Sequence, residues 1–166
     1  MSDPKREITK KRTFSFGFIF FGFILSLVLS NEYGFYCNLT DSFPQSYFVV
    51  KKHFYATEVS KKAIITTIVD FENPYIPQGK KLVKQIACDS GEMFETRGKE
   101  FYCNGQLIAI AQEKDSKNRD IVQFVYNGIV PNGKMFLTAE HPKSFDSRYF
   151  GFIEKSKVVE VVLWRF

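Results

Sequence analysis

The sequence has few of the residues from which common catalytic centres are built. It holds two histidines, His53 and His141, and three cysteines among 166 residues. Neither a CxxC nor an HExxH motif is present, so the sequence indicates no zinc site, and we expect no metal or other cofactor. A GxSxG nucleophile elbow is also absent, which argues against a Ser-His-Asp hydrolase of the α/β type.

Positive charge is concentrated at the N-terminus. The formal net charge is +5, and the first 13 residues hold five basic and two acidic side chains. The rest of the chain therefore has a net charge of only +2, which does not indicate a nucleic-acid partner.

A long uncharged run spans residues 14–30, FSFGFIFFGFILSLVLS. As a helix it would extend roughly 25 Å, slightly less than the ~30 Å hydrocarbon core of a bilayer. We predict a transmembrane anchor over 14–30, with a basic cytoplasmic N-terminus over 1–13 and an outer domain over 31–166, because basic residues favour the cytoplasmic side. A cleaved secretory signal is the alternative, since the small residue Ser30 ends the run.

From residue 45 onward, short β-rich runs alternate with turn signals, and no long segment has helical periodicity. This pattern predicts an all-β, mainly antiparallel domain, either a folded sheet or a barrel. One short helix is expected within residues 53–62, and a solvated hairpin loop over 112–120. The expected strands are 47–50, 63–69, 81–87, 100–103, 106–110, 121–126, 134–139 and 158–163.

The cysteines allow one intramolecular disulfide. Cys88 and Cys103 lie 15 positions apart on neighbouring predicted strands, and Cys37 is the odd one. A Cys88–Cys103 bridge fits an oxidising compartment. Spacing alone does not fix the geometry, so two buried free thiols are the other interpretation.

A lysine interrupts the apolar face of one predicted strand. Lys84 alternates with Leu82 and Ile86, and burial of its ammonium would lower the pKa from about 10.4. With a pKa of about 8, about one lysine in ten would be neutral at pH 7 and able to accept a proton from a hydroxyl group. Ser42 is the candidate residue that carries this hydroxyl. Taken singly, Ser42 is better explained as a turn residue before Pro44, and Lys84 as an edge-strand lysine that prevents aggregation. Their presence together favours the catalytic interpretation.

The order of these features resembles the type I signal peptidase family of Ser/Lys proteases, which implies a signal-peptidase-like β fold. The resemblance lies in Thr40-Asp41-Ser42-Phe43-Pro44, the lysine strand with its Gly-acid turn, and Ser144-Phe145-Asp146-Ser147-Arg148-Tyr149-Phe150-Gly151. Within the family, the chain is most similar to the TraF-type branch associated with plasmid conjugation. It departs from the family where leader peptidases carry Gly-Asp-Asn-Arg, since this chain has Ala139-Glu140-His141-Pro142, and at Gln85, where arginine is common.

The resemblance implies a catalytic role for the two residues already singled out. Ser42 would be the nucleophile and Lys84 the general base. Thr40 and the backbone N–H of Ser42 would form the oxyanion hole, although Thr40 is also a reasonable turn former.

The last motif is expected to support this dyad. Ser144 would hydrogen-bond the base lysine, and Asp146 with Arg148 would form a charged pair that holds the loop against the site. In the TraF-type branch the aspartate is also suspected of a direct catalytic part.

The resemblance further implies an endopeptidase of the bacterial inner membrane with a periplasmic catalytic domain. Its partner would be a propilin or preprotein held in the lipid bilayer, next to components of a conjugation apparatus. Water would resolve the acyl-enzyme, or the substrate's own N-terminal amine would do so and give a cyclic pilin. Two alternatives are a general signal peptidase that removes secretory leaders, and a noncatalytic, membrane-tethered scaffold of a conjugation or secretion apparatus.

Overall fold

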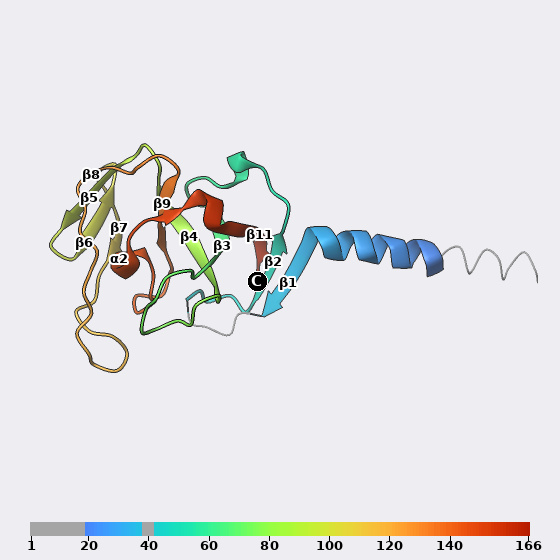
Figure 1. Cartoon of the computed structure of the whole chain (residues 1–166), viewed down its shortest axis with the longest axis horizontal. Coiled ribbons are helices and arrows are strands. Elements are labelled where there is room, and N and C mark those ends of the chain that lie inside the picture. The colour runs from blue at the N-terminus through green and yellow to red at the C-terminus, as the bar shows by residue number, and fades with distance from the viewer. Residues whose placement is uncertain (1–18, 38–41) are drawn as a thin grey trace, which may run out of the picture.

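The computed structural model describes residues 19–37 and 42–166. Residues 19–32 form a helix that projects from a β-rich domain (Figure 1). The other elements, in chain order, are β1 Tyr33–Cys37, β2 Tyr47–Lys51, the 3-10 helix η1 Ala56–Glu58, β3 Ile64–Ile68, β4 Lys81–Asp89, β5 Met93–Arg97, β6 Glu100–Cys103, β7 Gln106–Ile110, β8 Gly128–Ile129, β9 Lys134–Thr138, α2 Ser147–Phe150, β10 Ile153–Glu154, the 3-10 helix η2 Lys155–Lys157 and β11 Val158–Arg165.

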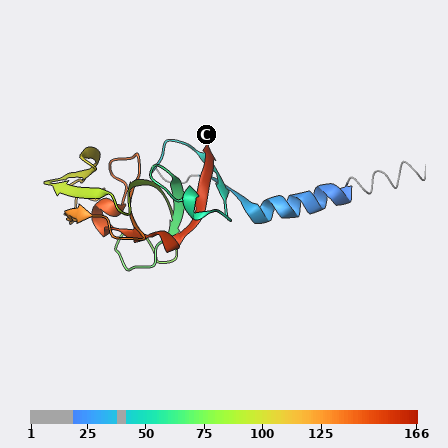
Figure 2. The same cartoon turned by 90° about the horizontal axis from the view of Figure 1, so that it is seen from above.

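The described strands form two antiparallel sheets. The larger has the order β1-β2-β11-β3-β4-β9-β10, and the smaller has the order β7-β6-β5-β8. The helix of residues 19–32 and β1 lie at one end of the molecule, and the smaller sheet lies at the other (Figures 1 and 2). The expectation of a mainly antiparallel β domain is therefore confirmed.

Seven of the eight expected strands are present, and the expected strand over 121–126 is wrong. The backbone there bonds to separate groups rather than to one partner strand: Phe124 N donates to the Arg148 carbonyl at 2.7 Å, and Tyr126 N donates to Thr96 Oγ1 at 3.2 Å. Phe124 and Tyr126 pack on an aromatic core, so their pattern reflects burial and not strand pairing.

The short elements departed most from expectation. Strands β1, β5, β8 and β10 were not foreseen, and the helix expected within 53–62 is reduced to the single 3-10 turn η1. Strands β8 and β10 have only two residues each, too few to show an alternating pattern, whereas β1 and β5 have five residues each and lack a clear apolar alternation.

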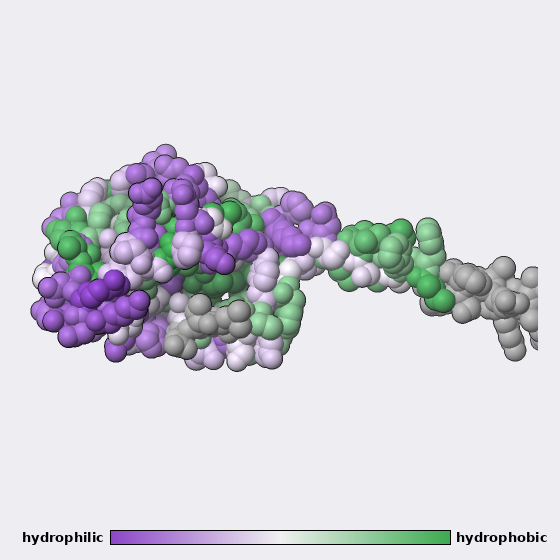
Figure 3. Space-filling view, turned by 60° about the horizontal axis from the view of Figure 1, so that its bottom comes forward, coloured by the Kyte–Doolittle hydropathy of each residue, from purple (hydrophilic) through white to green (hydrophobic). Residues whose placement is uncertain are grey.

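The expected transmembrane segment is only partly described. Residues 19–30 are helical, and residues 14–18 lie outside the described residues. Hydrophobic side chains cover the described helix (Figure 3). Within residues 19–37 and 42–166, no helix combines the length and apolarity that a membrane crossing requires.

Strand β4 connects the two hydrophobic cores. Ile86 of β4 packs with Ile65 of β3 and Leu137 of β9 beneath the larger sheet. Two positions further on, Cys88 belongs to the aromatic core that joins β9 to the smaller sheet around Phe94. At Gln85, β4 is paired with β3 on one side and with β9 on the other. This double pairing holds the backbone rigid next to Lys84, the residue before Gln85.

A disulfide joins Cys88 of β4 to Cys103 of β6, and both residues are completely buried. The bridge therefore links the larger sheet to the smaller one. Cys37 is free and exposed.

Removing the bridge should weaken the fold. The disulfide closes a segment of 15 residues, and a loop of that size corresponds to about 3 kcal/mol in the chain-entropy account. We expect Cys88→Ala/Cys103→Ala to lower the free energy of unfolding by about that amount in denaturant titrations of the full chain in detergent. Cys37→Ala is the matched control and should stay within about 0.5 kcal/mol of the wild type. Equal unfolding midpoints for the double variant and the wild type would contradict this prediction.

Candidate active site

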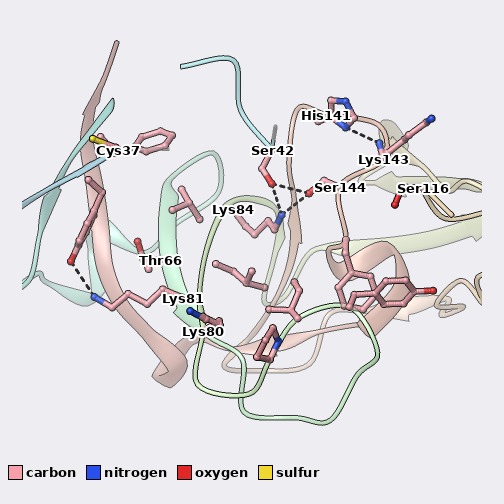
Figure 4. Close-up of a pocket in the computed structure, with 18 residues that line it drawn as sticks. Cys37, Ser42, Thr66, Lys80, Lys81, Lys84, Ser116, His141, Lys143 and Ser144 are labelled. Carbon is pink, nitrogen blue, oxygen red and sulfur yellow. Dashed lines mark hydrogen bonds between the residues drawn. The ribbon is translucent and has the colours of Figure 1, made fainter. Parts of the chain in front are cut away.

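A cleft of about 720 Å³ opens beside the start of β4. Its lining includes Ser42, residues 80–84, the segment 143–145 and residues 75–77. Figure 4 shows Ser42, Lys84 and Ser144 close together within it. Most of the residues singled out from the sequence lie in or directly behind this cleft.

Ser42 is positioned by the residue that follows it. Phe43 is buried and packs edge-on against Phe48 of β2, with the ring centroids 6.0 Å apart. The Ser42 carbonyl accepts a hydrogen bond from His141 N at 3.2 Å. These two contacts hold the Ser42 backbone while its hydroxyl faces the cleft.

Lys84 brings its amine to two hydroxyls. Lys84 Nζ lies 2.6 Å from Ser144 Oγ and 3.3 Å from Ser42 Oγ, and the two hydroxyl oxygens are 3.3 Å apart (Figure 4). Lys84 and Ser144 are buried, whereas Ser42 is partly exposed. A buried amine therefore contacts a hydroxyl that remains accessible from the cleft.

Burial lowers the pKa of Lys84 to about 8. The loss of solvation is the largest cause, the nearby Asp146 carboxylate raises the pKa, and the Arg148 guanidinium lowers it. At pH 7, about one molecule in ten then carries a neutral amine at this position.

Asp146 and Arg148 form a buried bidentate pair behind Ser144. Arg148 Nε and Nη2 each lie 2.8 Å from a carboxylate oxygen of Asp146. The same guanidinium donates to the carbonyls of Pro142 at 2.8 Å and Ser144 at 2.9 Å. The pair therefore fixes the loop that presents the Ser144 hydroxyl to Lys84.

The Asp146 carboxylate is fully used in this support. Besides Arg148, it accepts a hydrogen bond from Ala139 N at 3.1 Å. In the described part of the chain it makes no hydrogen bond to Ser42 or Lys84, so its contacts are with Arg148 and the backbone around Ser144. Among the described residues, no contact supports the direct catalytic role that the resemblance suggests for Asp146.

A second buried charge was missed from the sequence. Glu160 of β11 is 3% exposed and accepts hydrogen bonds from Tyr36 Oη at 2.6 Å and Lys81 Nζ at 2.7 Å. Burial raises its pKa, but Lys81, Tyr36 and the Thr66 hydroxyl together outweigh that effect, and the net direction is downward. Glu160 interrupts the apolar run of 158–162 as Lys84 interrupts that of β4, so the same signal was present in the sequence.

Two further features are Thr40 and a cluster of possible metal ligands. Thr40 lies outside the described residues. Among the described residues, one group has the proximity needed for a metal, namely Cys88, Glu92 and Cys103, but its two cysteines are joined to each other and offer no thiolate.

Strand β4 also has an open edge at the cleft. It pairs with β3 from Lys81 to Gln85, whereas its pairing with β9 runs only from Gln85 to Asp89. Over residues 81–84, the edge that would face β9 has no partner strand within the described chain. An extended peptide has room to pair there, directly beside Ser42 and Lys84.

The lowered pKa of Lys84 can be tested through stability. The folded value is about 8 and the ordinary value is 10.5. Between these values the unfolded chain binds a proton that the folded chain has released, so folding becomes more favourable as the pH rises. Relative to Lys84→Met, we expect the wild type to gain about 3 kcal/mol of unfolding free energy from pH 7 to 10.5.

Denaturant titrations at several pH values would measure this difference. Lys62→Met, at an exposed lysine outside the cleft lining, controls for loss of a charge without loss of the buried amine. A difference between wild type and Lys84→Met that stays constant over this pH range would show that the pKa is not lowered.

Comparison with known proteins assigns this sequence to a family. The sequence matches the family described as "Signal peptidase, peptidase S26" over residues 9–166. Among solved structures, the chain is similar to a signal peptidase I from Enterococcus faecalis V583, with 26% sequence identity, a TM-score of 0.42, and coverage of 63% of this chain and 96% of that chain. A search of curated proteins found no match. Because the family match spans nearly the whole sequence, the chain belongs to the peptidase S26 signal peptidases, a family of serine peptidases.

Proposed function

We propose that the protein is an endopeptidase in which Ser42 is the nucleophile and Lys84 the general base. The observation that supports this assignment is the contact among Lys84 Nζ, Ser42 Oγ and Ser144 Oγ at the cleft. A serine hydroxyl needs a base within hydrogen-bond reach, and an amine with a pKa of about 8 is partly neutral at physiological pH.

The reaction follows from this geometry. A neutral Lys84 that donates to Ser144 Oγ keeps its lone pair for the proton of Ser42. As Ser42 Oγ attacks the peptide carbonyl, Lys84 accepts that proton and then returns it to the leaving amine, which yields an acyl-enzyme. Following the family resemblance, the backbone N–H of Ser42 and the Thr40 hydroxyl would stabilise the oxyanion, and each such donor is typically worth about 2.7 to 4 kcal/mol.

The substrate would bind as an added strand. The free edge of residues 81–84 offers backbone groups to an extended peptide, and this edge ends at Lys84. Pairing at that edge would bring a peptide carbonyl past Ser42 Oγ. Disordered or unfolded segments suit this mode, because a folded substrate could not supply a free strand.

We further propose that the protein is anchored in the bacterial inner membrane with its catalytic domain in the periplasm. The apolar run of 14–30 and the basic residues before it support this orientation. Beside the described helix, β1, β2 and the C-terminus expose aromatic rings: Phe35 lies 5.6 Å from Tyr47 and 6.4 Å from Phe166 between centroids. Aromatic side chains favour the membrane–water interface.

The proposed substrate is a preprotein held in the same membrane, and the TraF-type resemblance favours a propilin of a conjugation apparatus. Ser42 is only 12 residues beyond Ser30, so the site lies close to the end of the apolar run. A general signal peptidase would instead process many secretory leaders, and the breadth of substrates cleaved in a cell extract distinguishes the two.

The intact mass of the candidate pilin tests the catalytic assignment. We expect processed pilin in cells that carry the wild type and full-length propilin in cells that carry Ser42→Ala, because the acyl-enzyme cannot form. Ser46→Ala, at an exposed serine four positions away, is the matched control and should process normally. A wild-type product lighter than the linear trimmed chain by one water would identify cyclisation, and equality would identify hydrolysis. Identical masses with and without Ser42 would favour the scaffold instead.

The pH dependence of cleavage tests the base. Only the neutral amine of Lys84 accepts the serine proton, so kcat/KM for a soluble peptide should rise about tenfold per pH unit below pH 8 and level off above it. Purified full-length protein in detergent would give this profile, with Lys84→Met inactive throughout. A rising limb centred near ~6.5 would instead point to a histidine.

A further inference from the structure

The cleft around Ser42 is lined by one sign of charge. Besides Lys84, its lining includes Lys80, Lys81 and Lys143, and no carboxylate of the described residues belongs to it. Lys80 and Lys81 lie to one side of Lys84, and Lys143 lies to the other side, near His141 (Figure 4). A concave surface with charges of one sign concentrates its field on whatever enters the cleft.

Two of these lysines are available to a ligand. Lys81 is engaged by Glu160, which neutralises its charge, and contacts Tyr36 Oη at 3.1 Å. Lys80 and Lys143 form hydrogen bonds only through their own backbone atoms: Lys80 N donates to Pro77 O, Lys80 O accepts from Val69 N, and Lys143 N donates to His141 Nδ1. Their exposed ammonium groups have no partner in the described part of the chain. The net positive charge of the cleft rim therefore comes from Lys80 and Lys143.

A buried hydroxyl lies deeper on the Lys81 side. Thr66 is 1% exposed, belongs to the cleft lining, and stands opposite Glu160 of β11 in the strand register. Its hydroxyl helps to lower the pKa of the Glu160 carboxylate, so Glu160 engages Thr66 as it engages Lys81. The exposed lysines are therefore the groups of the cleft that a charged ligand can reach.

We propose that this cleft selects peptides that carry aspartate or glutamate within about four residues of the scissile bond. The inference rests on the proposed function and specifies its substrate class. Lys81, the first residue of β4, precedes Lys84 by three positions, and Lys80 directly precedes the strand. A peptide paired with that edge has a rise of about 3.3 Å per residue, so an acidic side chain three or four residues from the cleaved bond reaches these lysines.

The same arrangement disfavours basic substrates. A lysine or arginine near the scissile bond would face Lys80 or Lys143 without an intervening carboxylate from the lining. Discrimination of this kind combines attraction of one charge with repulsion of the other. Because both lysines are exposed, the preference falls as salt shortens the Debye length from ~10 Å at 0.1 M to ~3 Å at 1 M.

Peptide cleavage by the full-length protein in an uncharged detergent tests the proposal. A proteome-derived peptide library identifies cleaved sequences by mass spectrometry, and a cleaved sequence is then remade with Glu or Gln at each of the four positions on either side of the bond. We expect the Glu peptide to exceed its Gln twin in kcat/KM by roughly fivefold at one or more positions, the size expected for one or two exposed ion pairs. In Lys80→Gln/Lys143→Gln this ratio should fall towards one, and in Lys80→Glu/Lys143→Glu lysine peptides should be preferred.

The control is Lys62→Gln/Lys99→Gln, which removes two charges outside the cleft lining and should keep the wild-type ratio. Cleavage that depends on Ser42 but shows equal rates for Glu and Gln peptides overturns this inference alone. Cleavage that does not depend on Ser42, or no cleavage, overturns the proposed function and the inference with it. If the Lys80/Lys143 variants change only binding to phosphatidylglycerol vesicles and leave peptide preference intact, the lysines serve lipid headgroups and the proposal fails.

Discussion

The burial of one ammonium group governs the organisation of this protein. Lys84 is buried on β4, just before the residues that belong to two hydrophobic cores, so water cannot solvate its charge and its amine contacts the hydroxyls of Ser42 and Ser144 instead. Removing the charge from water makes the amine a usable base. The proposed mechanism therefore has two structural requirements: water must be kept away from Lys84, and Ser42 must stay open to a peptide.

The loop after β9 meets the first requirement. Arg148 binds three backbone carbonyls of that loop and the Asp146 carboxylate, so Ser144 is held by a network whose two charged side chains are buried. A guanidinium suits this role, because its planar fork satisfies several acceptors at once, which a lysine could not do. The Asp146 and Arg148 charges also act on Lys84 in opposite directions, so the low pKa depends mainly on burial.

The open edge of β4 meets the second requirement. A strand with an unpaired edge is usually a site for aggregation, and this one is restricted to residues 81–84, where two of the four side chains are lysines. The two ends of the molecule differ in character. The apolar helix and the exposed aromatic rings lie near β1, and the disulfide-linked smaller sheet lies at the far end (Figure 1). Such a layout allows a membrane-held chain to approach the cleft from the helix side.

The sequence alone determined the antiparallel β class, most strands and the burial of Lys84, because alternation and a charge within an apolar run are local patterns, and its ordered motifs indicated the family. It did not show which partners Glu160 has, which backbone carbonyls Arg148 binds, or the open edge of β4. These depend on which segments pack together: Lys84 meets Ser42 from 42 positions away and Ser144 from 60 positions away. Periodicity carries no information over such separations, so only the tertiary packing decided how these residues meet.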